Sequence, residues 1–199
     1  MSMTWLLLAT GCTGGLTLLF LLRLPFRILS KPPTHFVHFS PKGGCTDLVV
    51  QELQKARSEI LVQAYSFTSQ PIAKALVDAK LRGVHVEILL DHSEEKEPHT
   101  DLHFFVEQGL APRIDAQHAI AHNKIIIIDS RTVITGSFNF TNQAEEHNAE
   151  NLLVLHHYSD LAALYRKNFF AHKEHCREPD LTVKPVESRY GKVAAKVAA

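Results

Sequence analysis

The hydrophobic and polar positions divide most of the chain into short apolar runs and longer amphipathic stretches. Short apolar runs bounded by turn residues are typical of strands, and apolar residues three or four positions apart are typical of helices. Strands are predicted at residues 35–39, 59–67, 84–91, 112–114, 124–128, 132–135 and 151–157. Helices are predicted at residues 46–56, 69–82, 102–108 and 159–173.

The order of these segments predicts the fold class. Between residues 35 and 91, strands and helices alternate along the chain. Such an order implies right-handed crossovers between parallel strands. The sequence therefore predicts an α/β domain with a mixed, largely parallel sheet flanked by helices.

The most continuous apolar strand begins at Lys124, which four isoleucines follow. A strand of this kind is typically buried on both faces. Asp129 then begins a turn, and the next apolar segment returns as a second strand. A hairpin of these two strands would bring Ser137 and Asn139 beside His122 and Lys124. Four polar groups would then converge on one point, an arrangement that suits an oxyanion with a nucleophile beside it.

These residues form one pattern, H-x-K-x4-D-x6-G-S-x-N, from His122 to Asn139. A lone histidine on an apolar strand is most often a packed core residue, but the complete pattern is far more specific. It resembles the HKD signature of the phospholipase D superfamily. The segment that follows, FTNQAEEHNAENLLVL, is similar to single-motif members, namely the bacterial Nuc-type endonucleases and the mitochondrial cardiolipin hydrolase/Zucchini group. The resemblance extends over residues 34–175.

The resemblance implies a catalytic set for phosphodiester hydrolysis. His122 would be the nucleophile and form a phosphohistidine that water later hydrolyses. Lys124, together with Ser137 and Asn139, would bind the phosphoryl oxygens. Glu150 would accept a hydrogen bond from His122 and so fix the orientation and tautomer of its ring. The alternative interpretation of Glu150 is a solvated loop carboxylate.

Asp129 belongs to the same signature and is counted with the catalytic residues that the resemblance implies. Its position predicts another role, since it lies a strand's length from His122. We expect its carboxylate to accept hydrogen bonds from backbone N–H groups in the turn.

A single HKD motif has a consequence for assembly. Hydrolysis needs one histidine as the nucleophile and another as the acid for the leaving alkoxide, and the two tasks require opposite protonation states. The chain contains no second H-x-K. The sequence therefore predicts a C2 homodimer in which both copies of His122 share one active site.

The predicted site uses no cofactor and no metal ion. Cys12, Cys45 and Cys176 lack the C-x-x-C spacing of zinc sites and form no disulfide framework that the sequence supports. Members of the Zucchini group often carry a Cys/His metal insertion early in the domain. This sequence has no such insertion, so no structural metal is predicted from the resemblance.

Composition and charge restrict the partners. The 199 residues, 45% of them hydrophobic, suit one globular domain. The net charge is zero, but residues 34–175 carry 13 Lys and Arg against 18 Asp and Glu, a net charge of −5. A nucleic-acid-binding protein usually has a basic surface. The charge balance therefore counts against a purely electrostatic grip on DNA or RNA.

The N-terminal segment predicts attachment to a membrane. Residues 4–22 are uncharged and mostly apolar, long enough for a helix to span a bilayer, and Arg23 and Arg27 follow. A signal peptide has its basic residues before the apolar run. An uncleaved anchor with the catalytic domain facing the cytosol is therefore favoured. A signal peptide, or an interfacial segment weakened by glycines, is the alternative.

The predicted domains are an anchor with a basic flank at 1–33, a catalytic domain at 34–175 and a disordered tail at 176–199.

The predicted catalytic set acts on a phosphate and does not specify what the phosphate carries. The anchor, its basic flank and the acidic domain favour a phospholipid such as cardiolipin in an anionic membrane. The resemblance to cardiolipin hydrolases suggests the mitochondrial outer membrane. The segment GSFNFT is similar to the nucleases, which leaves single-stranded RNA or DNA as the alternative substrate. A third hypothesis, a catalytically inactive membrane tether, is disfavoured by the intact motif.

Overall fold

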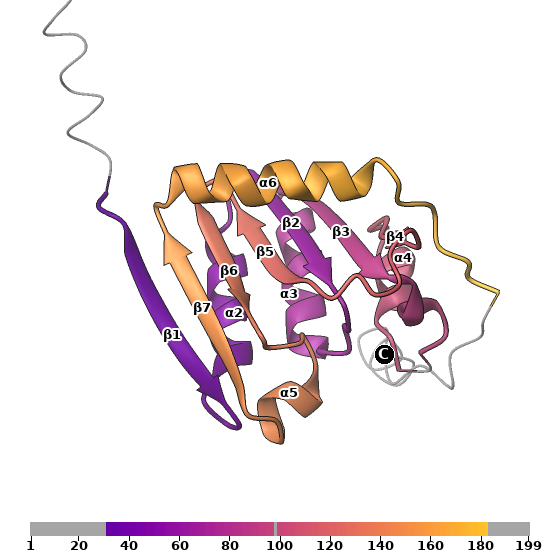
Figure 1. The fold of residues 1–199 in the computed structure, drawn as a ribbon, viewed down its shortest axis with the longest axis horizontal. Helices are drawn as coiled ribbons and strands as arrows, with labels where there is room; N and C mark the ends of the chain where they lie inside the picture. The colour runs from indigo at the N-terminus through magenta and orange to yellow at the C-terminus, as the bar shows by residue number, and fades with distance from the viewer. Residues whose placement is uncertain (1–30, 98, 183–199) are drawn as a thin grey trace, which may run out of the picture. The chain divides into compact units, whose positions relative to one another are not determined.

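The computed structural model describes residues 31–97 and 99–182, and the folded unit begins at Thr34. Within these residues, seven strands form one sheet in the order β1-β7-β6-β5-β2-β3-β4 (Figure 1). The strands are β1 (Thr34–Ser40), β2 (Glu59–Ala64), β3 (His85–Asp91), β4 (Arg113–Asp115), β5 (Lys124–Ile128), β6 (Thr132–Gly136) and β7 (Glu150–His156). The helices are α2 (Cys45–Lys55), α3 (Gln70–Leu81), the 3-10 helix η1 (His92–Glu95), α4 (Leu102–Glu107), α5 (Asn142–Glu146) and α6 (Ser159–Lys173).

The sheet is mixed, as predicted, but the prediction that it is largely parallel is wrong. Strand β3 pairs in parallel with β2 and with β4. Strand β5 pairs antiparallel with β2 and β6, and β7 pairs antiparallel with β6 and β1. The chain leaves β1 at one edge, and α2 carries it across to β2 near the other edge. The short turn after β5 then requires an antiparallel hairpin.

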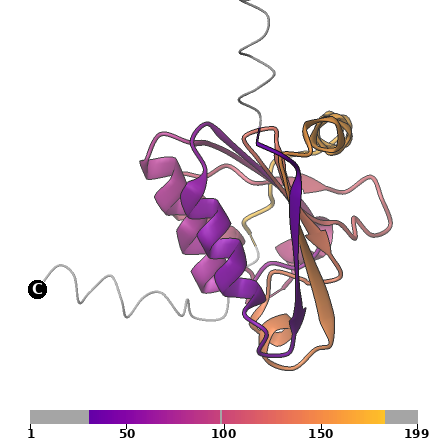
Figure 2. The ribbon, with the colours of Figure 1, turned by 90° about the vertical axis from the view of Figure 1, so that its left-hand side faces the viewer.

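Helices α2 and α3 cover one face of the sheet and α6 covers the other (Figure 2). The larger core lies under α2 and α3 and includes Val62 and Ile126. The smaller core lies under α6 and includes Ile127 and Phe169. Successive side chains of a strand point to opposite faces, so β5 contributes to both cores, as predicted. Burying each isoleucine side chain fully, relative to leaving it exposed, stabilises the folded state by about 1.5–3 kcal/mol.

The predicted hairpin between β5 and β6 is confirmed. Ile125 pairs with Thr135, and the two central residues of the turn, Asp129 and Ser130, have φ angles of 51° and 54°. Positive φ at both central residues gives the turn a twist that matches the twist of the two strands. The segment after β6 is thereby returned to the start of β5.

The chain stays attached to the fold beyond residue 175, where the sequence predicted the tail to begin. The backbone of Arg177 forms a bridge with Ile114 next to the edge strand β4. Its guanidinium donates to both carboxylate oxygens of Glu95, each at 2.7 Å. The predicted boundary is therefore too early. Residues 183–199 lie outside the described residues.

The predicted membrane anchor, residues 4–22, also lies outside the described residues. In the part of the chain that the structure does describe, no helix combines the length and the apolar character needed to cross a bilayer.

Candidate active site

Neighbouring strands bring most of the predicted site residues to one end of the sheet. Lys124, at the start of β5, lies opposite Ala64 at the end of β2. Strand β6 ends at Gly136, which lies opposite Leu152 of β7. The segment with Ser137 and Asn139 follows β6 directly, and Glu150 begins β7. The hairpin and β7 thus arrange the predicted phosphate-binding residues around the same strand ends.

Gly136 permits a close approach between β6 and β7. Its φ is 151°, and a Cβ atom there would lie 2.2 Å from the carbonyl oxygen of Asn151, so a side chain is excluded. The N–H groups of Ser137 and Phe138 both donate to that carbonyl, at 3.1 and 3.2 Å. The segment that carries Ser137 is therefore held against the start of β7.

The ammonium group of Lys124 is fixed inside this end of the sheet. Lys124 is 7% exposed, and its Nζ donates to the carbonyl oxygen of His122 at 2.9 Å. The same Nζ lies 5.0 Å from the centroid of the Tyr65 ring. Burial lowers the pKa of Lys124, and the negative charge of Glu150 counteracts this effect. The site therefore keeps a largely desolvated cation close to the backbone of His122.

The imidazole of His122 is exposed and rests on an aromatic side chain that the sequence analysis did not identify. The rings of His122 and Tyr65 have centroids 4.6 Å apart and an interplanar angle of 59°. The backbone N–H of Tyr65 donates to the carbonyl oxygen of Asn123 at 2.9 Å. Tyr65 therefore supports both the imidazole and the ammonium group. Its place just after β2 becomes informative only once β2 is known to pair with β5.

Ser137 and Asn139 both have unused hydrogen-bonding capacity. The exposed Ser137 Oγ accepts from the backbone N–H and the side-chain amide of Asn151, at 3.1 and 3.3 Å. Its hydroxyl proton is then available for an acceptor such as a phosphoryl oxygen. The Oδ1 of Asn139 is buried and has no hydrogen-bond partner among the described residues. Leaving such an acceptor unpaired costs about 1–3 kcal/mol, and only a donor can satisfy it, so a phosphoryl oxygen could be bound only by the Nδ2 amide group of Asn139.

The negative charge of Glu150 influences the protonation of Lys124. Its Oε1 accepts from the side-chain amide of Asn148 at 3.1 Å, and its charge favours the protonated form of Lys124. The hydrogen bond to His122 that the resemblance implies is not formed within the described part of this single chain.

Asp129 lies at the other end of β5 and makes the backbone hydrogen bonds expected from its position. Its carboxylate accepts from the N–H groups of Arg57, Ser58 and Glu59 and from the Ser58 hydroxyl, at 2.8 to 3.2 Å. These donors belong to the turn before β2, so Asp129 joins two turns. The structure does not bring Asp129 together with the other predicted catalytic residues.

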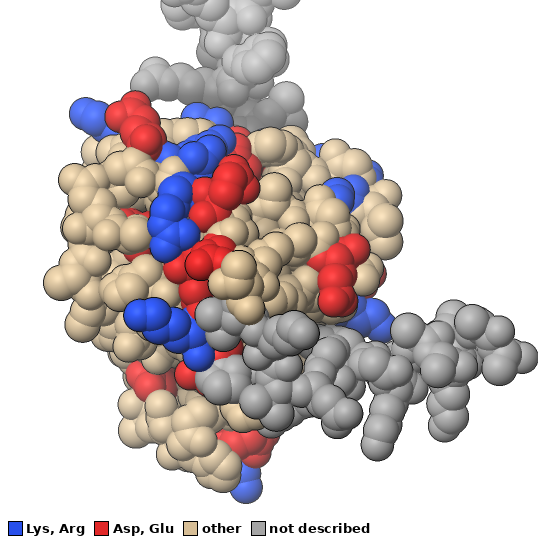
Figure 3. Space-filling model, turned by 90° about the vertical axis from the view of Figure 1, so that its right-hand side faces the viewer, with Lys and Arg blue, Asp and Glu red and all other residues tan. Residues whose placement is uncertain are grey.

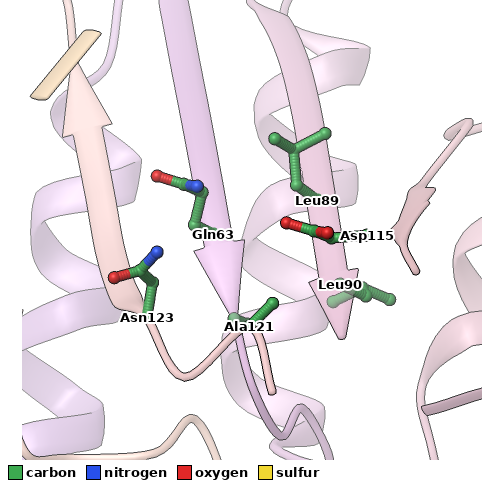
Figure 4. Close-up of a pocket in the computed structure, with 7 residues that line it drawn as sticks. Gln63, Leu89, Leu90, Asp115, Ala121 and Asn123 are labelled. Carbon is green, nitrogen blue, oxygen red and sulfur yellow. The ribbon is translucent and has the colours of Figure 1, made fainter. Parts of the chain in front are cut away.

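A small hollow lies beside the same strand ends (Figure 4). It is lined by Gln63, Ala64, Leu89, Leu90, Asp115, Ala121 and Asn123. Its cavity volume is about 10 Å³, room for about one water molecule and far below the roughly 300 Å³ at which ligand pockets begin. A large substrate does not fit this hollow, whereas His122 lies exposed at the open strand ends.

The geometry combines an exposed imidazole with a fixed ammonium group, a hydroxyl donor and an amide. This set can bind a tetrahedral phosphoryl group and present a nitrogen nucleophile to its phosphorus atom.

Sequence comparisons identify related proteins. The family described as "Cardiolipin synthase, PLD-like domain" matches residues 49–173. The "Phospholipase D" of Rickettsia typhi is 44% identical over 135 residues, which cover 68% of this chain and 66% of that protein. The "Mitochondrial cardiolipin hydrolase" of Xenopus laevis is 34% identical over 108 residues, 54% of this chain and 50% of that protein. The chain thus spans slightly less than two thirds of the first of these relatives and half of the second.

A solved structure shares the fold. The phospholipase D family member Nuc from Salmonella typhimurium superimposes with a TM-score of 0.72 and 36% sequence identity. The superposition covers 74% of this chain and 98% of Nuc.

Proposed function

Because the chain belongs to the phospholipase D superfamily of phosphodiesterases, we propose that it hydrolyses a phospholipid such as cardiolipin to phosphatidate. The proposed reaction passes through a phosphohistidine at His122. The observation that carries the proposal is the position of Lys124, whose buried ammonium group is held beside His122 at the end of β5.

The proposed reaction has two steps. In the first, the His122 imidazole attacks the phosphorus atom, and the bond from phosphorus to the leaving alcohol breaks. In the second, water attacks the phosphorus, the phosphorus–nitrogen bond breaks and the phosphate monoester leaves. Lys124, with Ser137 and Asn139, stabilises the negative charge that grows on the other phosphoryl oxygens in both steps.

The acid for the leaving alkoxide is proposed to come from a second copy of the chain. One imidazole cannot be the unprotonated nucleophile and the proton donor in the same step. A C2 homodimer would place a second His122 across the two-fold axis, next to the same phosphate. Glu150 would help to orient these rings once the shared site is formed.

Three observations support a lipid as the substrate. The relatives from Rickettsia and Xenopus have lipid hydrolase names. Strand β1 presents Phe36, Val37 and Phe39 with exposures of 49%, 47% and 65%. These apolar side chains follow closely after the basic residue Lys31, a combination that favours contact with an anionic membrane surface.

The proposed enzyme is anchored by its N-terminal segment, residues 1–33, with the catalytic domain facing the cytosol. By analogy with its cardiolipin hydrolase relatives, the proposed membrane is the mitochondrial outer membrane.

An endonuclease that needs no metal and cleaves single-stranded RNA or DNA is the second candidate, supported by the similarity to Nuc over nearly the whole of that protein. Figure 3 shows one face of the molecule, on which acidic and basic side chains are intermixed without a continuous basic area in its visible part. This face therefore gives the second candidate no additional support.

The substrate is tested by offering the purified full chain cardiolipin in liposomes and, separately, labelled single-stranded RNA and DNA. We expect phosphatidate from cardiolipin. His122→Asn should abolish turnover, and Lys124→Ala should lower the rate about 10²–10³-fold, the effect of losing one partner of transition-state charge. His85→Asn, which changes an exposed histidine of β3, is the matched control.

The outcomes separate the candidates. Cleavage of nucleic acid without cleavage of lipid would establish the second candidate. A near-normal rate in the His122 variant would remove the assignment of this histidine as the nucleophile.

A further inference from the structure

Four potential metal ligands converge away from the predicted catalytic set. Asp115 ends β4, and His118 lies in the loop that follows it. His172 and His175 lie at the end of α6, whose C-terminal end passes close to β4 in Figure 1. One ligand atom from each of the four residues lies within 4.8 Å of the other three.

The four side chains form a compact group around one carboxylate. Asp115 is 2% exposed and accepts from the Nδ1 of His172 at 2.7 Å and from the Nδ1 of His118 at 3.0 Å. The rings of His118 and His172 stack with centroids 4.8 Å apart, and each lies within 5.3 Å of the His175 ring. Three imidazoles therefore point toward a single buried anion.

Hydrogen bonds within the group leave one ligand atom unsatisfied. The Nε2 of His175 is buried and lies 3.3 Å from an oxygen of Asp115, but among the described residues it makes no well-aligned hydrogen bond. A buried nitrogen without a partner is costly, and a metal ion at the centre of the group would give it one.

We propose that Asp115, His118, His172 and His175 bind one divalent transition-metal ion, with zinc as the first candidate. Imidazole nitrogens and a carboxylate oxygen are common ligands of zinc. Zinc bonds of about 2.0–2.1 Å in a tetrahedron place ligand atoms roughly 3.3 Å apart. The four ligand atoms, at most 4.8 Å apart, are already gathered close to that spacing.

The proposed ion is structural. Four protein ligands complete a tetrahedral shell and leave no open position for a substrate or for a reactive water molecule.

The ion would join the end of α6 to the loop between β4 and β5. The same loop is fixed where Asp91 accepts from the N–H of Ala121 at 2.7 Å, immediately before His122. Figure 4 shows that Asp115 and Asn123 line the same hollow. The ion would therefore help to position the segment before β5, which carries the predicted nucleophile His122.

This proposal adds a metal to a chain for which the sequence predicted none. Cysteine spacing gives no signal for this site, because the ligands are two pairs, D-x-x-H at 115–118 and H-x-x-H at 172–175. His172 lies in the last turn of α6 and His175 in the turn just after it, so the second pair is a signal that the sequence itself contains.

The test measures zinc on the tag-free full chain, by elemental analysis after dialysis and by competition with a chromophoric chelator. We expect about one zinc ion per chain and a rise in melting temperature on adding zinc, as for any ligand that binds the folded state. His175→Gln removes a ligand atom that makes no hydrogen bond, so the fold should persist. Changing a residue that only hydrogen-bonds a metal ligand weakens metal affinity by about 10–100-fold. Loss of the ligand itself should therefore weaken zinc binding by at least about 100-fold.

His85→Gln, on an exposed histidine of β3, is the control and should bind zinc as tightly as the wild type. His118→Gln, on an exposed loop side chain, is the second variant if His175→Gln does not fold. The proposal is overturned if the folded wild-type chain binds no zinc, or if a folded variant lacking either ligand binds zinc with wild-type affinity. These measurements do not use catalytic activity, so the proposed function can fail without affecting them.

Discussion

Lys124 and Glu150 illustrate how single residues can set the working range of the site. The ammonium of Lys124 is buried, which lowers its pKa, and the carboxylate of Glu150 partly restores it. A phosphoryl group needs the protonated form of Lys124 as its partner. The proposed activity should therefore decline as the pH rises through the pKa of this lysine.

Replacing Glu150 tests this coupling. Glu150→Gln removes the negative charge that favours protonated Lys124, so the pKa of Lys124 should fall further. The alkaline limb of the pH–rate profile should move to lower pH. Glu146→Gln, an exposed carboxylate of α5, is the control and should leave the limb in place. An unchanged alkaline limb in the Glu150 variant would mean that Lys124 does not govern it.

At the scale of the elements, Asp129 connects the β5–β6 hairpin to the turn between α2 and β2. Burial raises the pKa of its carboxyl group, but hydrogen bonds from Ser58 and from neighbouring backbone N–H groups outweigh burial and hold the pKa below its usual value. A carboxylate of this kind stabilises the fold above the unfolded-state pKa of about 3.9, and the stabilisation is lost as the pH falls through the folded-state pKa.

The substitution Asp129→Asn should therefore destabilise the protein without harming the catalytic site. Asparagine tolerates the φ of 51° at this position, so the change removes mainly the charged acceptor. We expect a loss of about 1–3 kcal/mol in urea denaturation at pH 7, and a smaller difference from wild type below about pH 4. Asp78→Asn, exposed on α3, is the control. A difference that stays constant with pH would argue against this role of the carboxylate.

At the scale of the whole molecule, the proposed mechanism depends on two chains. Mixing wild-type chains with His122→Asn chains and allowing subunits to exchange tests the shared site. At equal amounts, about one quarter of random dimers keep both histidines. At constant total protein, cardiolipin hydrolysis should therefore fall to about one quarter of the rate of wild type alone. A fall to one half would mean that each subunit works alone. His85→Asn chains in place of the mutant should leave the rate unchanged.

The sequence alone determined the parts that depend on neighbours along the chain. The isoleucine run of β5 predicted a buried strand, and the turn at Asp129 predicted that it forms one half of a hairpin. A short turn between two strands makes an antiparallel pair, so the hairpin already implied that the segment with Ser137 and Asn139 would return to the start of β5. Helix α6 could likewise be predicted, because helical periodicity and end signals are local properties.

Only the tertiary structure decided which distant segments meet. The sequence did not indicate that β1 would pair with β7, so the largely parallel sheet was a wrong prediction. It did not indicate that Tyr65 would lie under the ring of His122, or that α6 would bring His172 to Asp115. Each of these contacts depends on the order of strands and on helix packing. The order of strands and the packing of helices are decided by the summed burial of many side chains, which no local pattern encodes.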